Sequence, residues 1–118
     1  MGRLSTHVLD TVTGKPAADV AIDLDVLQSG GSWRRLAQAR TNADGRTDQP
    51  LLSGDALMVG TYMLTFHMGA YFKTQGFAVA DPLFLDLIPV RFSIADAAGH
   101  YHVPLLATPW SYSTYRGS

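Results

Sequence analysis

The sequence contains no cysteine, which removes disulfide bonds and thiolate chemistry from consideration. The net charge is also small, because nine Lys and Arg residues against ten acidic residues leave a formal net charge of -1. Phosphate binding needs clustered Lys and Arg, so this balance argues against a nucleic-acid-binding protein. No apolar run approaches the length of a membrane-spanning helix, and the first residues lack the apolar core of a signal peptide. We therefore expect a cytoplasmic protein that binds neither nucleic acid nor a membrane.

Short alternating segments dominate what the sequence does contain. The clearest runs over residues 20–26, where apolar residues alternate with acidic or small ones, a period of two that is typical of a half-buried strand. A short helix is expected at 70–75, because alternation stops there and Gly76 follows as a left-handed helix end. Further strands are expected at 4–9, 33–41, 61–66, 90–94, 100–105 and 110–115, with a short one at Arg46.

Seven or eight short strands separated by Gly, Pro, Asn and Asp turns, with one short helix, predict an all-β fold. We expect a two-sheet antiparallel β-sandwich in one domain that spans residues 1–118, since this length suits a single core. No internal repeat or low-complexity tract competes with this interpretation.

Three residues with proton or charge chemistry fall at outward or turn positions: His7, Arg46 and His102. Alternation in the strand at 100–105 places His100 and His102 on the face opposite the apolar residues. Taken singly, each is more simply a surface or turn residue. Together, imidazoles that exchange protons near neutral pH and a guanidinium that binds carbonyl-rich rings fit hydrolysis of a small planar substrate without a metal or organic cofactor.

Three motifs carry a resemblance to a known family. They are Leu4-Ser5-Thr6-His7-Val8-Leu9-Asp10, Thr41-Asn42-Ala43-Asp44-Gly45-Arg46, and His100-Tyr101-His102-Val103-Pro104-Leu105-Leu106 followed by Tyr112-Ser113-Thr114-Tyr115-Arg116-Gly117-Ser118. This set resembles the signature of the 5-hydroxyisourate hydrolases, the transthyretin-like enzymes of urate breakdown. The resemblance runs almost from end to end. It departs at Ala107-Thr108-Pro109-Trp110, where relatives often carry Ser-Pro-Tyr, a change in packing more than in chemistry.

The resemblance implies a transthyretin-like (prealbumin-like) sandwich and a set of site residues. Catalytic roles fall on His7, Arg46, His102 and Ser118, and substrate-binding roles on His7, Arg46, Tyr115, Arg116 and Gly117. The implied reaction opens the six-membered ring of 5-hydroxyisourate to 2-oxo-4-hydroxy-4-carboxy-5-ureidoimidazoline, with no cofactor. His100 is expected to assist at most. His67, Tyr101, Trp33 and Trp110 are expected to be structural or surface residues.

The resemblance also implies a homotetramer, a dimer of dimers with its sites in a channel between subunits. The residues independently favour a second copy, because an outward strand face offers an open surface and no cleft that excludes water.

Three alternatives stay open at this point. A transthyretin-like carrier would bind a small molecule in the same channel without catalysis, although such carriers lack the His7, Arg46, His102 and Tyr115–Ser118 combination. A metal site is a second alternative, since His7, His100 and His102 could supply three imidazoles to zinc. An adhesin-like structural module is the third, because the sandwich fold alone says nothing of activity.

Overall fold

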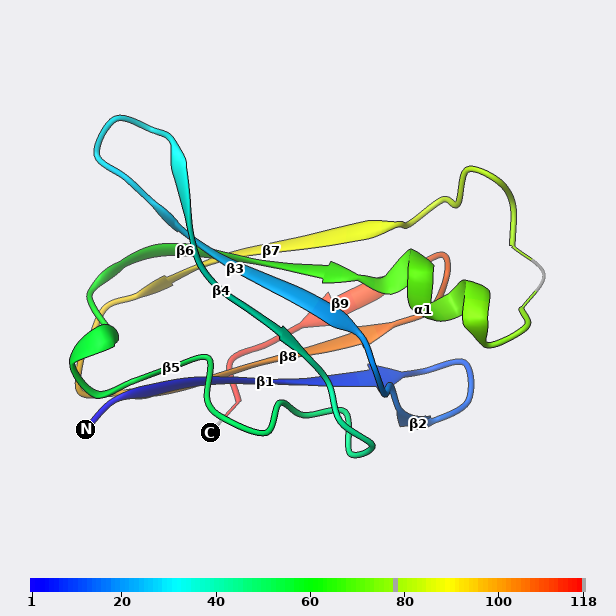
Figure 1. The fold of residues 1–118 in the computed structure, drawn as a ribbon, viewed down its shortest axis with the longest axis horizontal. Helices are drawn as coiled ribbons and strands as arrows, with labels where there is room; N and C mark the ends of the chain where they lie inside the picture. Colours follow the sequence, from blue (N-terminus) through cyan, green and yellow to red (C-terminus); the bar gives the residue numbers. More distant parts are fainter. Residues whose placement is uncertain (78, 118) are drawn as a thin grey trace.

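The computed structural model describes residues 1–77 and 79–117, which form two β-sheets packed face to face (Figure 1). One sheet contains β1 (Arg3–Asp10), β2 (Lys15–Pro16), β5 (Leu52–Ser53), β8 (His100–Ala107) and β9 (Tyr112–Thr114). The other contains β3 (Ala21–Leu27), β4 (Trp33–Arg40), β6 (Gly60–His67) and β7 (Leu87–Ile94). A 3-10 turn (Gly54–Ala56) and the helix α1 (Met68–Thr74) complete the elements.

The first sheet has the order β2-β1-β8-β9, with β5 also pairing β1, and the second has the order β4-β3-β6-β7. The alternating residues of the strands fill the space between the sheets. In β1 the buried residues Leu4, Thr6 and Val8 alternate with half-buried outward ones, and β6 repeats this pattern. The core therefore lies between the sheets, where side chains from both inner faces pack together, and the outward faces are left for polar residues.

The predicted two-sheet sandwich with one short helix is confirmed, with three differences of detail. Among the described residues the strands number nine, because β2 and β5 are two-residue strands that alternation cannot detect. β1 pairs with β8 in parallel, whereas the other pairings are antiparallel. Arg46 makes a single isolated bridge to His7 in place of a short strand.

Helix α1 follows directly from β6 and starts two residues before the predicted segment. Tyr71 and Phe72 are buried, and the backbone at Gly76 has φ 78°, the left-handed conformation expected after a helix end. Figure 1 shows this helix at one end of the sandwich, beyond the end of β6.

A buried carboxylate ties α1 to the first strand. Asp10, which is fully buried, accepts a hydrogen bond from the Tyr71 hydroxyl at 2.9 Å and others from the backbone N–H groups of Val12 and Thr13. Burial, followed by the contact with Asp10, raises the pKa of Tyr71. The hydroxyl therefore keeps its proton and donates a hydrogen bond to the carboxylate.

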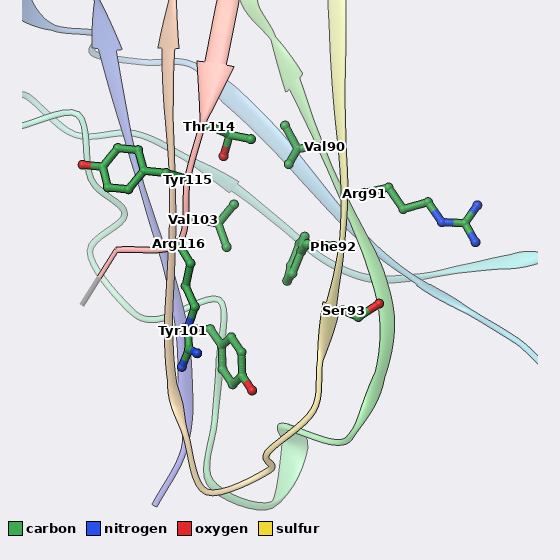
Figure 2. A pocket seen from close by; sticks show the side chains of 9 residues that line it. All are labelled: Val90, Arg91, Phe92, Ser93, Tyr101, Val103, Thr114, Tyr115 and Arg116. Atoms are coloured by element: carbon green, nitrogen blue, oxygen red, sulfur yellow. The ribbon is translucent and has the colours of Figure 1, made fainter.

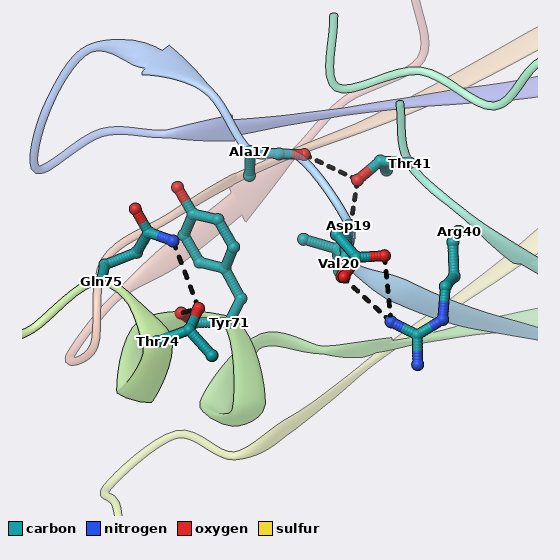
Figure 3. Close-up of polar contacts among 8 residues, drawn as sticks. All are labelled: Ala17, Asp19, Val20, Arg40, Thr41, Tyr71, Thr74 and Gln75. Atoms are coloured by element: carbon teal, nitrogen blue, oxygen red, sulfur yellow. Dashed lines mark hydrogen bonds and ion pairs between the residues drawn. The ribbon is translucent and has the colours of Figure 1, made fainter. Parts of the chain in front are cut away.

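A second buried polar group fixes the chain where β4 ends. The Thr41 hydroxyl donates to the carbonyl oxygen of Ala17 at 2.7 Å and accepts from the N–H of Val20 at 2.9 Å (Figure 3). Nearby, Arg40 pairs with Asp19 on the exposed side. The segment that leads to Arg46 thus starts from a fixed point.

Within the described residues, α1 and the 3-10 turn are both far too short to cross a membrane.

Replacing Tyr71 with Phe removes one donor from a buried carboxylate while it keeps the ring. Hydrogen bonds to charged groups contribute about 1.5–3 kcal/mol, so we expect Tyr71→Phe to lower the free energy of unfolding by about that amount. Urea unfolding at a fixed protein concentration measures it. Ser93→Ala, which removes an exposed hydroxyl contact to Thr61, should change stability by less than about 0.5 kcal/mol. Equal effects of the two substitutions would contradict the role of the buried contact.

Candidate active site

The outward face of the β1 and β8 pair presents a cluster of polar side chains. Parallel register sets Ser5 opposite His102 and His7 opposite Pro104. The Ser5 Oγ lies 2.8 Å from Nδ1 of His102, and the ring centroids of His7 and His102 are 6.2 Å apart with a 31° angle between their planes. Both histidines are half-buried. The predicted outward orientation of the two imidazoles is therefore seen in the structure.

Two further chain segments join this face through backbone bridges. Arg46 bridges His7 on one side of the pair, and Gly117 bridges His102 on the other. Residues from near the start, the middle and the end of the chain thus meet at one place. A water molecule or a small planar molecule on this face has access to two imidazoles and a guanidinium.

The turn that carries Arg46 is built around the side chain of Asn42. Its Oδ1 accepts hydrogen bonds from the backbone N–H groups of Asp44 and Arg46, and its Nδ2 donates to Asp48 at 3.0 Å. Asn side chains commonly hold turns in this way. The start of the Arg46 side chain is consequently fixed, although the residue itself is exposed.

Glycine is required in this turn at position 45. Its φ is 75°, and a Cβ there would lie 2.5 Å from the carbonyl oxygen of Val8. The Val8 N–H also donates to the Gly45 carbonyl at 2.8 Å. A side chain at Gly45 would push the turn off β1 and carry Arg46 away from His7.

Gly117 meets His102 just as closely. Its N–H donates to the His102 carbonyl at 2.7 Å, and an added Cβ would lie 2.8 Å from Cδ2 of the imidazole. The absence of a side chain at Gly117 leaves the space that the ring occupies.

The remaining C-terminal residues divide between the two sides of the sheet. Figure 2 shows Tyr115 pointing away from Val103 and Tyr101, toward the outward face. Arg116 lies on the inner side, with its guanidinium 4.1 Å from the ring centroid of Tyr101 and a hydrogen bond to the carbonyl oxygen of His100. Arg116 therefore does not join the histidine face in a single chain, and Ser118 lies outside the described residues.

The pKa of each site histidine is lowered from its ordinary value. Burial, followed by the charge of Arg46, lowers the pKa of His7. The pKa of His102 is lowered most by burial, and further by the charges of Arg46 and His7. Because each cause disfavours imidazolium, both rings are free to accept a proton at neutral pH.

Ser5 and Asn42 were not among the predicted site residues. Their position inside two of the quoted motifs was a signal, but their roles depend on contacts that alternation does not reveal.

A recess beside Ser5 and Arg46 is formed by one side of β1 and the chain after Arg46. Its lining residues are Arg3, Ser5, Thr6, Arg46, Thr47, Asp48, Gln49 and Pro50.

No group of three or more metal-ligating side chains is found within residues 1–77 and 79–117. The Nε2 of His100 lies 3.0 Å from the carbonyl oxygen of Met1.

Comparison with known proteins matches the chain over residues 4–117 to a model described as the HIUase/Transthyretin family. A protein named 5-hydroxyisourate hydrolase 2 from Rhizobium meliloti (strain 1021) is 54% identical over 117 residues, which is 99% of this chain and 97% of the relative. The structure of (S)-allantoin synthase matches with a TM-score of 0.93 and 45% identity, over 99% of this chain but only 44% of that one. Sea bream transthyretin in complex with thyroxine matches with a TM-score of 0.86 and 31% identity, over 98% of this chain and 94% of that one.

Removing the charge of Arg46 should raise the pKa of both site histidines, because that charge disfavours their protonated forms. In Arg46→Gln we expect the titrations of His7 and His102, followed by NMR of the imidazole protons, to move to higher pH. Arg40→Gln removes a positive charge that is paired with Asp19 elsewhere and should leave both titrations in place. Unchanged titrations in Arg46→Gln would show that Arg46 does not act on the histidines.

Proposed function

The chain belongs to the HIUase/Transthyretin family, and we propose that it is a 5-hydroxyisourate hydrolase that acts in urate breakdown. The observation that carries the proposal is the meeting of His7, His102 and Arg46 on one outward face. High identity to a hydrolase over nearly the whole of both chains supports the same conclusion.

In the proposed reaction, water adds to a carbonyl carbon of the six-membered ring of 5-hydroxyisourate. The ring C–N bond breaks, the carbon becomes a carboxylate, the nitrogen takes one proton of the water and the other proton is released to solvent, which gives 2-oxo-4-hydroxy-4-carboxy-5-ureidoimidazoline. His7 and His102 are the groups that take the proton from water and return one to the leaving nitrogen. The lowered pKa of each histidine supports this role, because a base must be unprotonated at working pH.

Arg46 and Tyr115 would bind the substrate oxygens and stabilise the negative charge that develops when water adds. A guanidinium suits this role because it stays charged and offers a planar fork of donors. We assign Gly117 to the substrate site through the room it leaves for His102. We also propose the catalytic role of Ser118 and the substrate-binding role of Arg116 that the resemblance implies. Binding by Arg116 requires its side chain to leave Tyr101 or to act toward another subunit.

A small-molecule carrier is the second candidate. The likeness to sea bream transthyretin in complex with thyroxine favours it. A carrier has no need of paired neutral imidazoles beside a guanidinium, so we rank it behind the hydrolase.

Replacing His7 or His102 with Ala should lower kcat by about 10²- to 10⁴-fold, the usual size of a lost acid–base group. The assay forms 5-hydroxyisourate from urate in situ and follows its ultraviolet decay against the uncatalysed control. His67→Ala is a matched control, because His67 pairs with Asp23 on the other sheet.

The outcomes of this assay separate the candidates. Near-normal turnover in both single variants would remove the histidines from the mechanism. Failure of the folded wild-type protein to accelerate the decay would reject the hydrolase and leave the carrier as the better proposal.

We further propose that the working form is a homotetramer, a dimer of dimers. Two features support it: β7 and β9 end their sheets without a further strand among the described residues, and the C-terminal region exposes Trp110, Tyr112 and Tyr115 at 62%, 44% and 60%. Unpaired edges and exposed aromatic residues are typical of faces that a second copy covers. Isologous pairing would place the same histidine face on both sides of a channel.

Light scattering after size exclusion should therefore give four times the 12.8 kDa mass of the chain. Activity per chain should fall on dilution at the same concentration at which the measured mass falls, because a lone subunit leaves the site open to water. A monomer with full activity would contradict the proposed assembly.

A further inference from the structure

Ser5 contacts the candidate base His102 through the pairing of two central strands. The parallel register sets Ser5 directly opposite His102, and the 2.8 Å separation joins Ser5 Oγ to Nδ1 of the imidazole. On either side of Ser5, Leu4 and Thr6 are buried, and the Thr6 hydroxyl donates to the carbonyl oxygen of Val103 at 2.7 Å. The backbone that carries Ser5 is thus fixed from the core side.

The imidazole of His102 is held from both edges. Nδ1 faces Ser5, while Cδ2, on the other side of the ring, faces the backbone of Gly117. A flipped ring would put a carbon against the Ser5 hydroxyl and lose the hydrogen bond. The observed orientation leaves Nε2 as the nitrogen that is open to the outward face.

A neutral imidazole carries its proton on one nitrogen, and the partner of the other nitrogen decides which. A serine hydroxyl can accept a hydrogen bond from Nδ1–H or donate one to bare Nδ1. The charged and titratable groups on or beside this face are Arg3 and His7 from β1, Arg46 and Asp48 from the turn and the chain after it, His100 from β8 itself, and Tyr115 after β9. Arg46 and His7 both disfavour the imidazolium form, so a partner for Nδ1–H matters most when His102 takes up a proton.

We propose that Ser5 is a positioning residue that orients His102 and occupies its Nδ1, so that Nε2 exchanges protons with water and substrate. The inference rests on the proposed hydrolase function. With Nδ1–H donating to Ser5 Oγ, bare Nε2 takes a proton from the attacking water, and the Ser5 oxygen stabilises the imidazolium. Nε2 then gives this proton to the leaving ring nitrogen, and His102 returns to its starting state.

The test compares Ser5→Ala with Ser5→Thr. Ser5→Ala removes the hydroxyl, and we expect kcat to fall about tenfold, the value of one hydrogen bond, with KM nearly unchanged. The acid limb of the kcat profile should move to lower pH, since the imidazolium loses a stabilising acceptor. Ser5→Thr keeps a hydroxyl on a strand residue and should restore both. Ser93→Ala, on the other sheet, is the matched control.

A second readout does not depend on activity. Nitrogen-15 NMR of the imidazole distinguishes the tautomers, and the His102 signals are identified by their absence in His102→Gln. One tautomer should dominate in the wild type and in Ser5→Thr, and a mixture should appear in Ser5→Ala.

Unchanged kcat and unchanged nitrogen shifts in Ser5→Ala would overturn the inference, as would equal losses of kcat in the Ala and Thr variants. Failure of the wild type to accelerate the decay of 5-hydroxyisourate would reject the hydrolase function instead. The NMR comparison would then still decide whether Ser5 orients His102.

Discussion

Strand β1 pairs in parallel with β8 over eight residues, from Arg3 opposite His100 to Asp10 opposite Ala107. These strands come from opposite ends of the chain, and Ser5 meets His102 across a separation of 97 residues. On the inner side, Leu4, Val8 and Leu105 are fully buried. A slip of one residue would bring His7 or His102 into that core, so burial on one face sets the polar geometry on the other.

The free edge of β1 explains how Arg46 reaches this geometry. β5 pairs with Arg3 and Leu4, and β2 pairs with Leu9 and Asp10, which leaves the middle of the strand without a neighbouring strand on that side. The turn at Gly45 and Arg46 fills this gap through its bridge to His7 and its hydrogen bond to Val8. The guanidinium is therefore carried by a turn that completes a sheet, which restrains it more than a free loop would.

Alternation was enough to predict which way His7, His102 and the residues beside them point, and loss of alternation with a following Gly located α1. It was not enough to predict partners. The alternation within β8 has a period of two whether the strand pairs with β1 or with β7, so it cannot identify the partner. The turn at 96–99 carries the chain from β7 in one sheet to β8 in the other. The Ser5 contact follows from that long-range choice, as does the inward position of Arg116, so neither was accessible from local sequence.

Burial and basicity oppose each other at this site. Burial is the largest cause of the lowered pKa of both histidines, and Arg46 adds to it. A second copy over the face would bury the rings further and reduce the screening of Arg46 by water, so their neutral fraction would rise while their strength as bases fell. An acceptor at Nδ1 of His102 offsets part of this loss, because it stabilises the imidazolium and so raises the pKa of His102. A neutral hydroxyl raises that pKa less than the negative charge of a carboxylate would, and so opposes the effect of Arg46 less.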